Sequence, residues 1–318
     1  MNQWKPSNKL FGGFIYIITG YLFKYLKSQN NKIKKGIYLL VAGILFAIKN
    51  EKVIEYKIEY SQIQKCGFKQ ICEIELNINQ EIKQPVFIYY EMKNFNQNYQ
   101  KYIDSYNQEQ IYQAQKLYSH QDNCEPFRTN QQICDKLKEL KIIQQSNEYR
   151  NILGQQFTQQ QMEQVAIPCG IKAFTYFNDE YKLYKIDGNQ KQEINIKSDN
   201  ISWEFDQKNI KNYDAQQQWI NIENQRFQNW IRVSGLSKFK KLWGKIDQDL
   251  KTGNYIIEIN NKFDQKIYNT YKNILINNVT SIGGKNPVLV IAHLVGGSVT
   301  LLLGFVFIIY HIKTKSNK

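Results

Sequence analysis

The most extended apolar run in the chain lies near its C-terminus. Val288–Tyr310 contains no Asp, Glu, Lys or Arg, and its one histidine is His293. About 20 apolar residues in a helix span the ~30 Å hydrocarbon core of a bilayer, and a helix satisfies its own backbone N–H and C=O groups there. The run therefore predicts a transmembrane helix at 287–312 rather than a buried core helix, and the lysines of 313–318 predict a cytosolic tail. Small residues that would let another helix approach closely are Gly296, Gly297, Ser298 and Gly304.

Two shorter apolar runs, Phe11–Phe23 and Gly36–Ile48, lie near the N-terminus, and each has 13 residues. That is fewer than a bilayer requires. In one interpretation a single helix spans at about 33–50, with its lysines reaching the membrane surface, while residues 10–26 lie in or at the membrane. In the other, 10–26 spans as well and the N-terminus lies outside. We favour two spans in total with both termini in the cytosol. A cleaved signal peptide is disfavoured because no small-residue cleavage site follows either run.

Between the membrane runs the pattern changes to a period of two. Ile54–Tyr60 alternates apolar and charged residues, and Ile74–Ile78 alternates similarly, which predicts two half-buried strands. Apolar positions at helical spacing predict one helix within 131–149 and another over Leu236–Ile246. Further strands are predicted at Val86–Tyr90, Tyr181–Ile186, Ile194–Ile196, Ile201–Phe205 and Tyr255–Ile259.

Many strands without a regular alternation of strands and helices indicate an antiparallel, sandwich-like domain, which we place at 50–286. Residues 1–49 then form the N-terminal cytosolic and membrane region. The expected fold class is an α+β membrane protein, in which two transmembrane helices flank a large β-rich extracytosolic domain with disulfides and short helices.

The net charge of +14 does not indicate a nucleic-acid partner. Residues 1–49 hold eight lysines and no acidic residue, and residues 287–318 hold three lysines and no acidic residue. Only +3 therefore remains for the domain between them. The excess charge lies beside the apolar runs, as the positive-inside rule predicts, and not on a globular face.

Five cysteines lie between the membrane runs, where an extracytosolic location would favour disulfides. The cysteine positions alone do not fix the pairing. His120 is the one histidine of this segment, so a zinc site is poorly supplied, and no metal or cofactor is expected. Two sequons, Asn200-Ile-Ser202 and Asn278-Val-Thr280, are candidate glycosylation sites. The cysteines are Cys66, Cys72, Cys124, Cys134 and Cys169.

Several short motifs follow one another along the chain. Cys124-Glu-Pro-Phe-Arg128, Pro168-Cys-Gly170 and Gly283-Gly284-Lys285-Asn286 resemble elements of the cell division control protein 50 (ligand-effect modulator 3) family. Members of that family are accessory β-subunits of phospholipid flippases, the type-IV P-type ATPases. The chain departs from the family at Ser281, where the family has Trp, and at Glu180, where the family has Thr. Other matching residues are Asn94, Phe95, Gln97, Asn98, Phe177, Asn178, Asp179, Trp230 and Arg232, with Trp4-Lys5-Pro6 near the N-terminus.

The resemblance implies the pairing and the function. It implies disulfides joining Cys66 to Cys72 and Cys124 to Cys169, with Cys134 left over. It implies a heterodimer with an ATPase α-subunit, whose extracytosolic loops the domain covers, in contact with membrane lipid. The chain would then be a non-catalytic subunit that supports the pump's exit from the endoplasmic reticulum and its phospholipid translocation. Its location would be the endoplasmic reticulum, Golgi, endosome or plasma membrane.

The residues themselves give little support to catalysis. No serine-hydrolase, metalloprotease or P-loop motif occurs, and the Asp-Lys-Thr-Gly motif of P-type ATPases is absent, so the chain is not the pump. The alternative from another class is a membrane-anchored surface receptor or adhesion glycoprotein that acts without a pump, and an ectoenzyme comes third. Five matching polar residues form either a polar site or, as we expect, hydrogen-bonded turn and core positions. They are Asn94, Asn98, Asn178, Asp179 and Arg232.

Overall fold

The computed structural model describes residues 31–316 except for 113–123 and 282. The predictions made for residues 10–26 and for the Trp4-Lys5-Pro6 element lie outside this part of the chain. The structure divides into two compact units, which are described separately.

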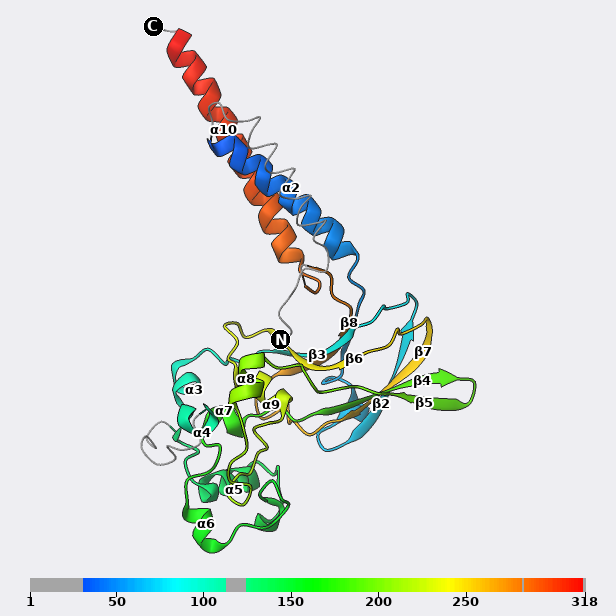
Figure 1. The fold of residues 1–318 in the computed structure, drawn as a ribbon, viewed down its shortest axis with the longest axis vertical. Coiled ribbons are helices and arrows are strands. Elements are labelled where there is room, and N and C mark those ends of the chain that lie inside the picture. Colours follow the sequence, from blue (N-terminus) through cyan, green and yellow to red (C-terminus); the bar gives the residue numbers. More distant parts are fainter. Residues whose placement is uncertain (1–30, 113–123, 282, 317–318) are drawn as a thin grey trace. The chain divides into compact units, whose positions relative to one another are not determined.

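The larger unit, Tyr56–Ile276, is built on two four-stranded antiparallel sheets (Figure 1). The strand orders are β1-β8-β3-β6 and β2-β7-β4-β5. The ring of Tyr181 on β4 lies 4.8 Å from that of Trp243 on β6, so the two sheets meet face to face, as the sequence predicts. The strands are β1 (Glu55–Glu59), β2 (Ile71–Ile78), β3 (Val86–Lys93), β4 (Glu180–Asp187), β5 (Gln190–Ile194), β6 (Phe239–Ile246), β7 (Gly253–Asn260) and β8 (Tyr271–Asn277).

Strand β2 shows how the period-two pattern fixes the register. Every second residue from Cys72 to Ile78 is buried, and the residues between them are exposed. The strand pairs with β7 along its whole length, from Ile71 opposite Asn260 to Ile78 opposite Gly253. A shift by one residue would move the whole apolar set to solvent, so the pattern specifies this pairing.

The helix predicted over Leu236–Ile246 is wrong, because Phe239–Ile246 is strand β6. Phe239, Lys241 and Trp243 alternate toward the interior. Lys241 stands at a buried position of this alternation and is only 7% exposed. Because a lysine is normally expected at the surface, Lys241 hides the alternation of this strand. The remaining apolar residues then show an apparent helical spacing.

Three other predictions need correction. The strand predicted at Ile201–Phe205 is wrong, because helix α8 (Glu204–Asn209) begins there after Trp203. The helix predicted within 131–149 is shorter: α5 (Asn130–Glu139) ends before Lys141, whose positive φ of 57° cannot continue an α-helix. Strand β5 ends at Ile194, so the strand predicted at Ile194–Ile196 lies earlier in the chain.

Residues 124–174 form a small helical lobe, called the disulfide lobe here, on one side of the sheets (Figure 1). Its core holds Ile133, Tyr149 and Met162 together with three cysteines. The remaining helices are short and mostly connect strands. They are α3 (Gln100–Asp104), α4 (Gln108–Tyr112), α6 (Gln159–Glu163), α7 (Ile171–Phe174), α9 (Gln225–Ile231) and the 3-10 turns η1 (Gln64–Cys66) and η3 (Ser146–Glu148).

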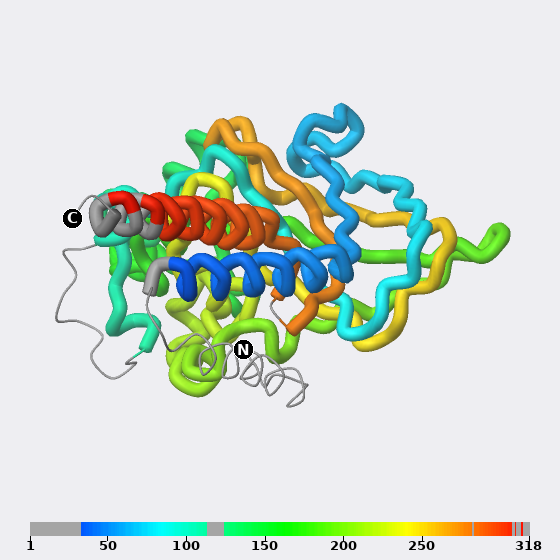
Figure 2. The backbone as a smooth tube through the Cα atoms, turned by 90° about the horizontal axis from the view of Figure 1, so that it is seen from above, coloured from blue at the N-terminus to red at the C-terminus, as the bar shows by residue number. Residues whose placement is uncertain are grey.

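The smaller unit consists mainly of two long helices, α2 (Asn31–Glu51) and α10 (Pro287–Ser316). They lie side by side in opposite directions (Figures 1 and 2). A Cβ on Gly36 would lie 2.7 Å from Leu301 Cγ, so glycine allows the helices to approach closely. Equally close approaches occur at Gly43, Gly297 and Gly304.

Among the described residues, one helix is long and apolar enough to cross a membrane, at Pro287–Val306. Only 11% of its most apolar stretch is buried within the protein. Its apolar side chains therefore do not form part of a protein core. Helix α2 does not pass the same test, and a second span there remains a prediction.

Candidate functional site

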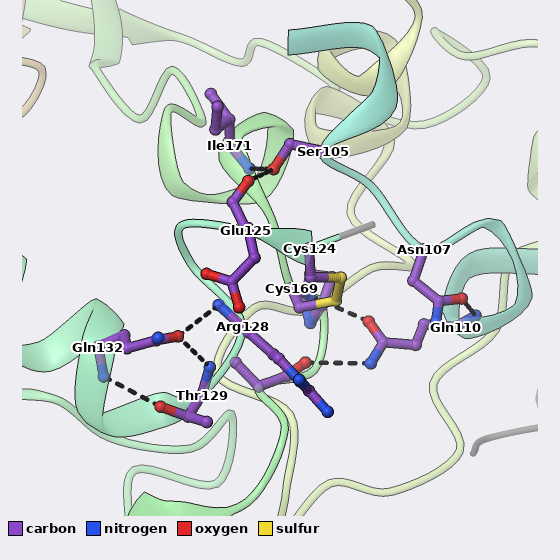
Figure 3. Close-up of a disulfide and its surroundings, with 12 residues drawn as sticks. Ser105, Asn107, Gln110, Cys124, Glu125, Arg128, Thr129, Gln132, Cys169 and Ile171 are labelled. Carbon is purple, nitrogen blue, oxygen red and sulfur yellow. Dashed lines mark hydrogen bonds between the residues drawn. A yellow bond between two sulfur atoms is a disulfide. The ribbon is translucent and has the colours of Figure 1, made fainter. Parts of the chain in front are cut away.

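A disulfide between Cys124 and Cys169 closes the disulfide lobe, with 5.5 Å between the two Cα atoms (Figure 3). This is the pairing that the family resemblance implies. Both residues are buried. Gln110 on α4 supports the bridge from outside the lobe, because its Oε1 accepts from the Cys169 N–H at 3.0 Å and its Nε2 donates to the Ala166 carbonyl at 3.1 Å. The buried Gln110 amide therefore fixes the segment that carries Cys169.

Ser105 joins the two sides of this disulfide (Figure 3). Its Oγ donates to the Glu125 carbonyl at 2.7 Å and accepts from the Ile171 N–H at 2.9 Å. Gly170 lies against it with φ +92°, and a Cβ there would lie 2.3 Å from the Ser105 carbonyl oxygen. Only glycine fits, which gives the Pro-Cys-Gly element a steric reason.

The second disulfide joins Cys66, at the end of η1, to Cys72 on β2, with 5.1 Å between the Cα atoms. Asn261 Nδ2 donates to the Cys66 carbonyl at 2.7 Å and holds this corner against the segment directly after β7. Cys134 is free and lies in the core of the disulfide lobe. Burial raises the pKa of its thiol, which disfavours the reactive thiolate.

Asp179 is the acceptor of a buried ion pair that the sequence did not reveal. Its Oδ2 lies 2.7 Å from Lys272 Nζ, and both side chains are fully buried. Its Oδ1 accepts from the N–H groups of Lys262 and Phe263 at 2.8 and 2.7 Å, and the Tyr60 hydroxyl donates to Oδ2 at 2.6 Å. Burial lowers the pKa of Lys272, and attraction to Asp179 opposes that shift. The pair fixes β4, β8 and the 261–263 segment against one another.

Trp230 and Arg232 lie at the end of α9, where two buried side chains hold them. Asp206, which is 0% exposed, accepts from Arg232 Nε at 2.5 Å and Nη2 at 2.9 Å. Lys241 donates to the carbonyls of Asn229 at 3.0 Å, Trp230 at 2.9 Å and Arg232. Burial lowers the pKa of Lys241 to about 7, with a smaller contribution from Lys172. Lys241 thus caps the carbonyl end of α9.

The polar residues of the Asn94–Asn98 segment hold the loop that follows Arg232. Gln97 is fully buried, and its Oε1 accepts from the Ser234 N–H at 3.0 Å. Asn98 Nδ2 donates to the Gly235 carbonyl at 2.9 Å. Asn94 has φ 63° directly after β3, a left-handed conformation that asparagine tolerates well.

The aromatic members of the matching set belong to the interior. Phe95 is buried, with its ring 5.5 Å from that of Trp230. Phe177 is buried and stacks on Tyr90 at 4.0 Å. Asn178 is exposed, although its neighbours in the sequence are buried. Phe95 and Phe177 are therefore part of the core packing.

Gly283–Asn286 builds the turn that starts α10. Thr280 and Gly283 exchange two backbone hydrogen bonds of 2.9 Å, and Gly283 has φ +99°. Asn286 Oδ1 accepts from the Leu289 N–H at 3.0 Å, and its own N–H donates to Asn50 Oδ1 at 2.7 Å. Asparagine before Pro287 is a favourable helix start. Gly284 and Lys285 complete this turn.

The two sequons differ in their surroundings. Asn200 is exposed, with φ 55°. Asn278 is half-buried, and its Oδ1 accepts from the Ile54 N–H at 2.8 Å. Among the described residues no group of three or more His, Cys, Asp and Glu side chains is placed to hold a metal ion.

The matching residues that the structure describes therefore lie at separate places in the fold. They form separate supports: two disulfides, a buried ion pair, a turn before α10 and a held loop after α9. Sequence reasoning missed several of the partners, because a buried Gln, Lys or Ser looks locally like its surface counterparts. The missed partners are Tyr60, Ser105, Gln110, Asp206, Lys241 and Lys272.

Comparison with known proteins agrees with the motifs. Residues 24–317 match the LEM3 (ligand-effect modulator 3) family / CDC50 family. ALA-interacting subunit 3 of Arabidopsis thaliana is 27% identical over 267 residues, which cover 79% of this chain and 66% of that protein. Cell cycle control protein 50A of Bos taurus is 24% identical over 329 residues, with 89% of this chain and 82% of that protein covered.

A yeast relative has a more explicit name. The phospholipid-transporting ATPase accessory subunit CRF1 of Saccharomyces cerevisiae is 24% identical over 263 residues, which cover 76% of this chain and 59% of that protein. The chain spans about two thirds of the length of the plant relatives, with 65% of putative ALA-interacting subunit 2 and 66% of ALA-interacting subunit 3 covered. Since the family match extends over nearly the whole sequence, the chain belongs to the LEM3 (ligand-effect modulator 3) / CDC50 family.

Proposed function

We propose that this chain is a non-catalytic accessory subunit of a type-IV P-type ATPase, which supports the pump's exit from the endoplasmic reticulum and its translocation of phospholipid. The family match over residues 24–317 carries the proposal, and the name of the yeast relative points the same way. The geometry fits a binding role. The matching residues support loops and packing and do not gather titratable groups around a cleft.

The arrangement of α2 and α10 supports a topology with two membrane spans. The helices run in opposite directions, so the lysines at the start of α2 and Lys313 near the end of α10 lie at the same end of the pair. Under the positive-inside rule that end is cytosolic. The Tyr56–Ile276 unit then lies outside the cytosol, where its two disulfides are chemically favoured.

Depletion of the chain in its own cells tests the proposal. The expected result is that a type-IV P-type ATPase accumulates in the endoplasmic reticulum and that inward transport of a fluorescent phospholipid falls. Re-expression of the wild-type chain should restore both. Normal ATPase location and normal lipid transport after depletion would contradict the proposal and favour the pump-independent surface receptor.

Glycosylation follows from the same topology, and the structure separates the two sequons. We expect a glycan on Asn200, which is exposed, and none on Asn278, which lies in the short segment before Pro287 and bonds to Ile54. Endoglycosidase should shift the wild-type chain and the Asn278→Gln variant on a gel, and should leave Asn200→Gln unchanged. The reverse pattern would contradict this assignment.

A further inference from the structure

A short loop after α9 displays the most exposed large apolar side chain of the larger unit. We call residues 233–237 the α9–β6 loop. Leu236 within it is 73% exposed, more than any other large hydrophobic residue described in Tyr56–Ile276, and Val233 is 42% exposed. A single exposed leucine is common on protein surfaces. Whether it indicates a binding surface therefore depends on how the loop is held.

Polar groups of the Asn94–Asn98 segment fix the backbone of this loop. The Gln97 and Asn98 side chains bond to the Ser234 N–H and the Gly235 carbonyl at 3.0 and 2.9 Å, and the Phe95 N–H donates to the Ser237 carbonyl at 3.1 Å. Two motifs that are far apart in the sequence thus converge on one loop.

The N-terminal side of the loop is held just as firmly. Arg232, directly before it, is bonded twice by the buried Asp206, and its carbonyl accepts from the buried Lys241. The loop therefore presents Val233 and Leu236 in a fixed conformation, so that a partner would not have to bear the entropy of ordering it.

The surroundings extend the apolar surface. Tyr99, next to Asn98, is 46% exposed. Trp203 is 46% exposed, and the Arg232 guanidinium lies over its ring, with 4.7 Å between Arg232 Cζ and the centroid of the Trp203 ring. Phe205 on the adjacent α8 is 61% exposed. Exposed tryptophan, tyrosine and arginine around a fixed apolar centre are the side chains that dominate protein–protein binding energy.

The exposed charge beside the loop is mainly basic. Lys238 follows the loop with its side chain 62% exposed, whereas its nearest carboxylate, Glu91, is buried. On the neighbouring helix α8, the exposed Glu204 carboxylate is paired with Lys208 at 2.7 Å. Lys101 is also exposed.

We propose that the α9–β6 loop docks its Val233 and Leu236 side chains into an apolar hollow, rimmed by carboxylates, on an extracytosolic loop of the ATPase partner. The inference rests on the proposed function. The contact would depend on the two motifs that hold the loop, the Asn94–Asn98 segment and the segment ending at Arg232. The need for a fixed loop would also explain why Gln97 and Lys241 are buried next to it.

The test compares Leu236→Asp with a matched control, Leu153→Asp, in the tagged full-length chain expressed in its own cells. Leu153 is 56% exposed and lies in the disulfide lobe. Both changes put a carboxylate on an exposed site, so both variants should fold, which limited proteolysis checks. Leu236→Asp is expected to lower recovery of the ATPase about tenfold, as for a binding hot spot, and Leu153→Asp is expected to leave recovery unchanged.

A photo-crosslinking residue in place of Leu236 identifies the occupant. A crosslink to the ATPase supports the proposal. A crosslink to lipid alone, or full ATPase recovery with a folded Leu236→Asp variant, would overturn it while leaving the proposed function intact. If the wild-type chain captures no ATPase at all, the proposed function fails and this inference fails with it.

Discussion

The two sheets and the disulfide lobe of the same unit are stabilised in different ways. The sheets bury a continuous set of strand residues and place an ion pair, Asp179 with Lys272, where neither side chain is exposed. The lobe has a small core in which the disulfide of Cys124 and Cys169 is a central member. A small core gains little from burial, so a covalent link stabilises it more effectively. The sheets instead depend on polar groups that must all remain paired.

Breaking the ion pair tests the sheet side of this comparison and should have the largest effect. Lys272→Met leaves Asp179 buried with its charge uncompensated, so we expect a loss of about 5 kcal/mol in unfolding free energy, the upper end for a fully buried pair. Denaturant unfolding of the full chain in detergent, followed by tryptophan fluorescence, measures it. The matched control is Lys182→Met, whose solvent-exposed ammonium pairs with Glu258 and should contribute far less to stability. Equal losses in the two variants would show that the buried pair has no special role.

Opening the lobe disulfide should give the next largest effect and a different kind of failure. The loop between Cys124 and Cys169 has a sequence separation of 45, for which chain entropy predicts about 4 kcal/mol. We expect the Cys124→Ser, Cys169→Ser double variant to be cleaved by protease within the lobe while the sheets survive, and to lose co-purification with the ATPase. Normal co-purification would count against a structural role for this bond.

The second disulfide should matter less. Cys66 and Cys72 are six residues apart, which corresponds to about 2 kcal/mol, and β2 remains held by its full ladder with β7. The Cys66→Ser, Cys72→Ser variant should therefore keep the ATPase while its unfolding midpoint falls. If this variant loses the ATPase as completely as the lobe variant, the length of the closed loop does not explain the difference between the two disulfides.

The smallest expected effect is a pH dependence from Lys241. Its pKa is about 7 in the folded chain against an ordinary value of 10.5, so the unfolded chain binds more protons between those values. Stability should then rise with pH in this window and be flat below pH 7. Relative to a Lys241→Met variant, the wild-type chain should gain about 1 kcal/mol from pH 7 to pH 8. An identical pH profile for both would mean that the three carbonyls hold the pKa near its ordinary value.

The sequence predicted those elements whose side chains obey a simple pattern. Strand β2 is confirmed because burial along it follows residue type, and α10 is confirmed as a long apolar helix because its apolar run is unbroken. Strand β6 was misread as a helix because Lys241 occupies an interior position that only the carbonyls at the end of α9 make tolerable. Tertiary packing creates that environment, so the sequence around Lys241 does not reveal it.

The candidate site was predictable as a set of residues but not as an arrangement. The resemblance singled out Gln97, Asn98 and Arg232, yet nothing in the sequence says that residues so far apart hold one loop. The partners that support them, Asp206 above all, are ordinary polar residues until burial makes their hydrogen bonds obligatory. Long-range pairing of this kind is a property of the fold.

The most direct test of the central claim is recovery of the tagged chain from detergent-solubilised membranes, with mass spectrometry of what accompanies it. We predict a type-IV P-type ATPase in a one-to-one ratio with the chain. Recovery of the chain alone, or with extracellular ligands and no ATPase, would contradict the account and leave a family member that acts without a pump.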